Sequence, residues 1–202
     1  FFPNFSEMNE FFNITGAGQE YNNPTQELIS LFVPGDTRKE VTVGVPGGFY
    51  DADSVFHALP TSTNQTYTKK YFDSSPVRAD SKANWKVIRY ADVLLMYAEA
   101  LNENGKPQQA IPFLNQVRTR AGLEGYPNTM SQTETRDAIV LERRLELSFE
   151  GVRWFDLVRT GKAYEVMKDK GMAPYMTVFP IPLSQVQIIN DPTIFPQNPG
   201  YD

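Results

Sequence analysis

The sequence predicts a mainly α-helical fold in which helical hairpins are combined with long irregular loops and minor β structure. Three amphipathic stretches in the second half of the chain predict the helices. The first half is rich in Asn, Thr, Ser, Gly and Pro and shows little hydrophobic periodicity, which is typical of loops. We therefore expect one domain with a loop-rich segment, residues 1–84, and a helical region with a Pro-rich tail, residues 85–202.

The first predicted helix lies within residues 85–104. It carries two apolar stripes, which indicates a helix that is covered on two sides. The main stripe consists of Val87, Ala91, Leu94, Ala98 and Leu101, and the second of Ile88 and Leu95. Gly105 is expected to end this helix, and Pro107 suits the first turn of the next one.

The second predicted helix has an apolar face formed by Ala110, Leu114, Val117 and Ala121. Pro112 removes one backbone hydrogen bond, so this helix either begins late or bends there. The spacing of apolar and small residues in the two helices fits one tetratricopeptide repeat. Because a solenoid needs about three repeats to bury its faces, we expect this pair to pack against the third helix and against further chain.

The third predicted helix is a single one that ends at Gly161, and residues 131–134 offer a capping box at its start. Its apolar face consists of Ala138, Leu141, Leu145 and Phe149, and its other side of Glu142, Arg143, Glu146 and Glu150. We expect Arg143 and Arg144 to tie helices together through carboxylates such as Glu99, Glu142 or Glu146.

Four shorter elements are predicted outside these helices. Residues 25–32 predict a helix capped by Thr25, and the valines at every second position of residues 40–45 predict a strand. Towards the end of the chain, we expect a strand at residues 175–179 and a brief helix capped by Ser184.

Composition excludes several classes of function. The 202 residues are 41% hydrophobic and 21% charged, which is ordinary for a globular domain. There is no run of about 18 apolar residues, so no membrane-spanning helix is expected. The net charge of −5 argues against a nucleic-acid partner. The absence of cysteine excludes disulfides, thiol nucleophiles and thiolate metal sites.

The segment GGFYDADSVFH, residues 47–57, combines residue types that suit carbohydrate. Aromatic rings can stack on the C–H faces of sugars, carboxylates accept hydrogen bonds from hydroxyls, and glycines allow close approach of the backbone. Two tyrosines in the following segment extend such a platform. The predicted ligand-binding residues are Phe49, Tyr50, Asp51, Asp53, His57, Tyr67 and Tyr71.

Other candidate sites carry weaker signals. His57 is the only histidine, which excludes a metal site with two histidines. Ca²⁺ is an alternative ligand of Asp51 and Asp53, although residues 51–54 lack the rest of an EF-hand loop. We expect no other cofactor. The aromatic pair Trp154 and Phe155 is interpreted as packing at a helix end rather than as a sugar platform.

Several segments, in this order, resemble the C-terminal part of the SusD/RagB family. They are PTQELISLF, GDTRKE, YTKKYF, IRYADVLLMYAEALNENG, LNQVRTRAGL, RDAIVLERRLELSFEGVRWFDLVRTG, FPIP and QNPGY. The resemblance runs from about residue 20 to the end and is strongest over residues 88–161. It implies a SusD-like α-α superhelix.

The resemblance also implies a function. Members of this family are cell-surface lipoproteins of Bacteroidetes-type bacteria that bind glycans or related nutrients and pass them to a SusC-like TonB-dependent transporter in the outer membrane. Membrane contact is then expected only through a lipid anchor, which we expect to lie outside this chain. The first residues resemble neither a signal peptide nor a natural start, so we expect a truncated or processed chain without the N-terminal part of the family fold.

We therefore predict a non-catalytic binder of glycans or oligosaccharides. Two alternatives belong to other classes of protein. A tetratricopeptide-like scaffold would bind proteins and no small ligand, and a glycan-cleaving enzyme would use a pair of the 24 acidic residues. Saccharide binding distinguishes the first alternative, and release of products from a polysaccharide distinguishes the second.

Overall fold

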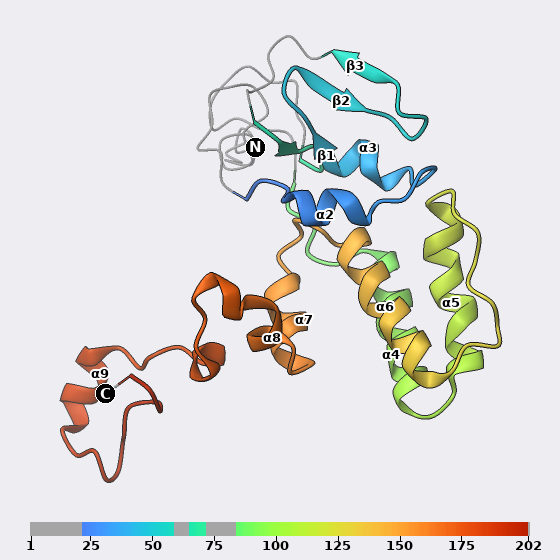
Figure 1. Cartoon of the computed structure of the whole chain (residues 1–202). Helices are drawn as coiled ribbons and strands as arrows, with labels where there is room; N and C mark the ends of the chain where they lie inside the picture. Colours follow the sequence, from blue (N-terminus) through green and yellow to red (C-terminus); the bar gives the residue numbers. More distant parts are fainter. Residues whose placement is uncertain (1–21, 59–64, 72–83, 202) are drawn as a thin grey trace, which may run out of the picture. The chain divides into compact units, whose positions relative to one another are not determined.

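The structure is a computed structural model that describes residues 22–58, 65–71 and 84–201. It divides into two compact units, Phe1–Gly151 and Val152–Asp202. The change in composition at residue 85 therefore lies inside the first unit. Figure 1 shows the course of the chain through both units.

Three long helices pack together in the first unit, as predicted. They are α4, Tyr90–Glu103, α5, Pro107–Arg120, and α6, Gln132–Glu146. Each of them packs against the other two, and the side chains between them form one hydrophobic core. This core contains Leu94, Leu95, Ala98, Ala110, Leu114, Val117, Ala138 and Ile139. The mainly α, tetratricopeptide-like fold class is thus confirmed.

The ends of these helices follow local rules. Gly105 adopts a positive φ of 73° directly after α4, in the left-handed region that favours glycine. Pro107 begins α5 as predicted, whereas the exposed Pro112 lies inside that helix and does not delay its start. At the start of α6, the Ser131 hydroxyl accepts a hydrogen bond from the Glu134 N–H at 3.3 Å. The Glu134 carboxylate accepts one from the Ser131 N–H at 2.8 Å, which confirms the capping box.

The prediction of a single third helix as far as Gly161 is wrong. Helix α6 ends at Glu146, and α7, Arg153–Arg159, follows only after a turn. Phe149 and Gly151 in that turn have φ values of 66° and 80°, which no α-helix can accommodate. The apolar spacing continues through the turn because Leu145 and Phe149 both reach the same hydrophobic cluster. Periodicity alone therefore did not reveal the break.

The helix predicted at residues 25–32 is present as α2, Gln26–Leu31. The Thr25 hydroxyl accepts a hydrogen bond from the Leu28 N–H at 3.2 Å, so the predicted cap is confirmed. A second hydrophobic cluster is centred on Leu28, Phe32, Val43 and Leu145. It packs α2 and the first strand against the end of α6.

The strand predicted at residues 40–45 is largely wrong. Residues Arg38–Thr42 form the helix α3, and only Val43–Gly44 form the strand β1. The Asp36 carboxylate accepts hydrogen bonds from the Arg38 N–H at 3.0 Å and from its guanidinium, which favours a helix start at this point. Val41 is 51% exposed, so the alternating valines do not all lie on one buried face of a strand.

Two small antiparallel sheets complete the described part of the first unit. β1 pairs with β4, Tyr67–Thr68, and β2, Gly48–Tyr50, pairs with β3, Phe56–Ala58. The turn between β2 and β3 closes a short hairpin, which we call the β2–β3 hairpin, residues 48–58 (Figure 1).

The second unit contains α7, α8, Ala163–Met167, α9, Leu183–Ile189, and the 3-10 helices Lys168–Lys170 and Pro174–Thr177. The strand predicted at residues 175–179 is therefore wrong. The predicted cap at Ser184 is also wrong, because α9 has Pro182 at its N-cap position.

Phe155 is 69% exposed, which contradicts a packing role for this ring. No helix in the described ranges is long and apolar enough to cross a membrane.

Candidate functional site

Five of the seven predicted ligand-binding residues lie together on the β2–β3 hairpin. Phe49 faces His57 across the two strands, and Tyr50 faces Phe56. Because side chains alternate along a strand, the two pairs lie on opposite faces of the hairpin. The sequence pattern thus located a compact group of aromatic and acidic residues, although it did not single out Phe56.

The face with Tyr50 and Phe56 is the accessible aromatic surface of the hairpin. Their side chains are 43% and 46% exposed, and their ring centroids lie 5.3 Å apart at an angle of 58°. Val55 beside them is 55% exposed. Two tilted rings that already contact each other leave apolar surface that a sugar face can cover.

The opposite face of the hairpin is a layered contact. The rings of Phe49 and His57 stack with centroids 5.0 Å apart and an angle of 15°. The ammonium group of Lys69 lies 2.8 Å from the centre of the Phe49 ring, in a cation–π geometry. Lys69 also donates a hydrogen bond to the Glu40 carbonyl oxygen at 2.7 Å. This face is therefore already held by side chains of the chain itself.

Asp51 organises the turn of the hairpin. Its carboxylate accepts hydrogen bonds from the Asp53 N–H at 3.1 Å and from the Val55 N–H at 2.8 Å, and its second oxygen lies 2.7 Å from His57 Nε2. The hydrogen bonds from His57 and Val55 lower the pKa of Asp51. Three partners on one carboxylate indicate a turn-capping residue.

Among the described residues, no group of three His, Asp or Glu side chains is placed to hold a metal ion.

Tyr67 and Tyr71 are buried rather than displayed at the surface, with exposures of 1% and 0%. Tyr67 supports the hairpin from below, because its hydroxyl donates a hydrogen bond to the Gly48 carbonyl oxygen at 3.0 Å. A Cβ atom on Gly44 would overlap the Tyr67 ring, so this approach requires glycine. The structure therefore does not place these two rings with the other predicted residues at the surface.

Tyr71 instead supports an aromatic residue that the prediction missed. Its ring is parallel to that of Trp85, with centroids 5.4 Å apart and an angle of 3°. Trp85 is 46% exposed, so a rigidly backed indole reaches the surface. Burial raises the pKa of Tyr71 to about 12, which keeps its hydroxyl neutral.

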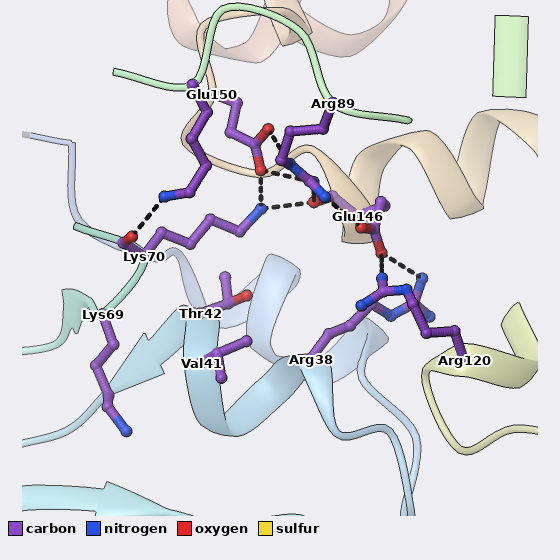
Figure 2. Close-up of a pocket in the computed structure, with 10 residues that line it drawn as sticks. Arg38, Val41, Thr42, Lys69, Lys70, Arg89, Arg120, Glu146 and Glu150 are labelled. Atoms are coloured by element: carbon purple, nitrogen blue, oxygen red, sulfur yellow. Dashed lines mark hydrogen bonds and ion pairs between the residues drawn. The ribbon is translucent and has the colours of Figure 1, made fainter. Parts of the chain in front are cut away.

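A pocket of about 340 Å³ lies beside the hairpin in the first unit (Figure 2). Cationic side chains from segments far apart in the sequence dominate its wall. The residues that line it are Arg38, Val41, Thr42, Lys69, Lys70, Lys86, Arg89, Arg120, Glu146 and Glu150. Lys69 belongs both to this pocket and to the stack on Phe49, so the pocket adjoins the hairpin.

The two carboxylates of this pocket hold its wall together (Figure 2). Glu146 accepts from Arg89 at 2.8 Å and from Arg120 at 2.5 Å. Glu150 accepts from Lys70 at 2.7 Å and from Arg89 at 2.8 Å. Burial raises the pKa of Glu150, but the hydrogen bonds and charges of Arg89 and Lys70 outweigh it and leave the pKa below its usual value.

A second group of charged side chains is joined to the pocket through Arg38, which lines the pocket and donates to Glu142. Glu142 is fully buried and accepts hydrogen bonds from Arg38 at 2.6 Å, from Arg118 at 2.7 Å and from the Tyr126 hydroxyl at 3.2 Å. We call Glu142, Glu146 and Glu150 the carboxylate row. The sequence assigned these residues to the polar side of a helix, whereas the structure buries all three.

Arg143 and Arg144 connect helices as predicted, and their ion pairs include two acids that the prediction did not name. Arg143 donates to Asp92 at 2.8 Å and so connects α6 to α4. Arg144 donates to Glu27 at 2.8 Å and so connects α6 to α2. Ion pairs between side chains thus connect helix α6 to both α4 and α2.

The chain is similar to known proteins along most of its length. The model of the SusD family matches residues 7–195. SusD-like protein P38 of Formosa agariphila is 36% identical over 156 residues, which are 73% of this chain and 28% of that protein. SusD-like protein P2 of the same organism is 32% identical over 157 residues, 69% of this chain and 31% of that protein. The chain thus spans less than a third of these relatives.

Solved structures agree with this similarity. A laminarin-binding SusD-like protein has a TM-score of 0.66 and 34% identity, over 91% of this chain and 39% of that one. Surface glycan-binding protein A from Bacteroides fluxus has a TM-score of 0.68 and 26% identity, over 93% and 42% of the two chains. The family match covers far more than half of the sequence, and so the chain belongs to the SusD family.

Proposed function

We propose that this chain is part of a non-catalytic, cell-surface protein that binds glycans or related nutrients at the β2–β3 hairpin. The observation that carries the proposal is the pair of accessible rings, Tyr50 and Phe56, on a hairpin of a chain similar to a laminarin-binding protein. Sugars stack on such rings through their C–H faces, and hydrogen bonds from nearby polar groups add orientation.

Binding rather than catalysis fits the state of the acidic residues. A glycosidase needs one carboxylic acid whose pKa is raised and a second carboxylate at a fixed distance across a cleft. The buried acids of the carboxylate row are instead hydrogen-bonded to arginine and lysine, and the pKa of Glu150 is lowered. This arrangement stabilises carboxylates as structural anions. We expect no release of reducing ends when the protein is incubated with the polysaccharide that it binds.

Delivery of the ligand to a SusC-like TonB-dependent transporter is the second part of the proposal. In this scheme the protein is a lipoprotein at the surface of the outer membrane. Co-purification of the full-length protein with the transporter after mild detergent extraction tests this part. Recovery of the protein without any outer-membrane transporter would contradict it.

The hairpin assignment predicts the effect of two substitutions. We expect Tyr50→Ala and Phe56→Ala each to weaken saccharide affinity about tenfold, because each removes one stacking ring. Both rings are well exposed, so thermal stability should remain nearly unchanged. Isothermal titration with oligosaccharides, laminarin oligosaccharides among them, measures the change in affinity.

Tyr164→Ala is the matched control for these variants. Tyr164 is 43% exposed, like Tyr50, but lies on α8 in the second unit. It should bind saccharide as the unsubstituted protein does. Equal affinities in all four proteins would contradict the assignment to the hairpin and direct the search to other exposed rings in the described part of the first unit, those of Trp85, Tyr90 and Tyr97.

A protein-interaction scaffold is the second candidate function, and one observation favours it. Val93, Met96 and Tyr97 on α4 are 42%, 45% and 50% exposed, so this helix displays apolar surface. Such a surface is typical of contacts with further protein. A protein that retains the transporter but binds no member of a broad saccharide panel would favour this candidate.

A further inference from the structure

We infer that the basic pocket beside the hairpin binds an anionic group of the glycan, namely the carboxylate of a uronic acid or a sulfate ester. This inference rests on the proposed function and names a substrate class for it. Six of the pocket residues are cationic and only two are anionic. A volume of about 340 Å³ lies at the lower end of the range of about 300–1,000 Å³ typical of small-ligand sites, which suits a single charged sugar residue.

Two of the cations carry the argument, because no carboxylate of the described residues lies within 4.0 Å of their ammonium groups. Lys69 donates to the Glu40 carbonyl oxygen, and Lys86 donates to the Lys70 carbonyl oxygen at 2.9 Å. Both ammonium groups also lie over aromatic rings, those of Phe49 and Tyr71. Carbonyl oxygens and rings satisfy donors but supply no full negative charge. An anion in the pocket would supply it.

The remaining cations set the geometry of the pocket. Arg89 and Lys70 are fixed by Glu150, and Arg120 by Glu146, so their positions do not depend on a ligand (Figure 2). Arg120 is 57% exposed at its side chain and Arg89 is 27% exposed. Guanidinium donors that remain accessible can form charge-assisted hydrogen bonds to carboxylate or sulfate oxygens. The pocket therefore combines fixed donors with two lysines that form no close ion pair with a carboxylate of the described residues.

Lys69 places the pocket next to the hairpin. It lines the pocket and also covers the Phe49 ring, on the face of the hairpin opposite Tyr50 and Phe56. A glycan that stacks on Tyr50 and Phe56 therefore has to pass the edge of the hairpin to bring its charged residue to the pocket. Neutral glycans would use the hairpin alone, and anionic glycans would gain the electrostatic contribution.

The burial of these lysines adds a dependence on pH. Burial lowers the pKa of both Lys69 and Lys70 to about 8, against the attraction of Glu40 and Glu150, and it also lowers the pKa of Lys86. Glu146 and Arg89 also act on Lys70, and Glu150 and Arg89 on Lys86. A bound anion favours the charged form, so binding takes up protons near this pH.

The test compares matched charged and neutral probes. Tri-galacturonic acid, a sulfated galactan oligosaccharide and a neutral galactose trimer are titrated into the full-length protein by calorimetry at low and high salt. We expect one or both anionic probes to bind at least about tenfold more tightly than the neutral trimer at low salt. The stronger of the two anionic probes identifies the group that the pocket prefers.

Two variants assign this preference to the pocket. Lys86→Gln is expected to weaken binding of the preferred anionic probe about tenfold and to leave the neutral trimer unaffected. Lys69→Gln also loses the contact with the Phe49 ring, so it is expected to weaken binding of the anionic probe more than binding of the neutral trimer. Lys106→Gln, at an exposed lysine between α4 and α5, is the control for loss of general positive charge. Circular dichroism confirms that each variant is folded. Raising the pH from about 7 to about 9.5 should weaken binding of the anionic probe only.

The outcomes distinguish a failure of the pocket assignment from a failure of the proposed function. Equal affinity for neutral and anionic probes, or an equal loss in Lys106→Gln, overturns the assignment of the pocket and leaves glycan binding at the hairpin intact. Failure of every probe, laminarin oligosaccharides included, overturns the proposed function and the pocket assignment with it.

Discussion

Glu142→Ala is expected to lower the free energy of unfolding of the first unit by about 3–5 kcal/mol, because it removes the common partner of the buried Arg38 and the partly buried Arg118. Arg38 and Arg118 both donate to this carboxylate, and Arg38 is only 4% exposed. Without Glu142, Arg38 retains Asp36 and a more distant contact with Glu146 at 3.8 Å. Its charge is then under-compensated at a position where the side chain is only 5% exposed.

Urea denaturation monitored by circular dichroism measures this loss, and Glu103→Ala provides the control. Glu103 also binds an arginine, at 2.7 Å from Arg136, but both side chains are more than 40% exposed. Solvent compensates the loss of such a pair, so its removal should leave stability nearly unchanged. A Glu142→Ala protein as stable as Glu103→Ala would show that the carboxylate row does not hold the unit together.

Gly48→Ala is expected to disrupt the β2–β3 hairpin and to abolish measurable saccharide binding there. A Cβ atom on Gly48 would overlap the carbonyl oxygen of His57 on the partner strand and press on the Phe56 ring. The obstacle is backbone rather than a flexible side chain, so the strands must separate. Overpacking of this kind costs about 1–3 kcal/mol, and here it also displaces Phe56 from Tyr50.

Calorimetry with the preferred saccharide measures the loss, and Ser54→Gly is the comparison within the same hairpin. Ser54 has a φ of 64°, a conformation that glycine adopts without strain. This substitution should therefore fold normally and bind saccharide. Normal binding by Gly48→Ala would contradict the role of strand pairing in the site.

The helical part of the fold was predictable from local signals. The capping residues Thr25 and Ser131, the Pro107 start and the Gly105 end are all rules of short range, and the structure confirms them. The errors arose where a distant contact decides the backbone. Residues 40–45 have the alternation of a strand, but the chain begins a helix at Arg38, whose guanidinium binds the distant Glu142 as well as Asp36.

The candidate site was predictable only in part, for the same reason. The hairpin residues are neighbours in sequence, so their composition revealed them as a group. The pocket brings together residues from α3, from the segment after β4, and from the ends of α5 and α6, and no spacing in the sequence joins them. Lys70 and Glu150, for example, are 80 positions apart. Burial of the carboxylate row also reversed its expected place on the polar side of a helix.

The carboxylate row has a consequence for how proteins of this kind diversify. Each of its acids holds cations from other segments, so a change at one position demands a matched change elsewhere in the chain. The turn of the β2–β3 hairpin, in contrast, is closed mainly by its own Asp51. Selection can therefore exchange the exposed rings of the hairpin one at a time without a new scaffold.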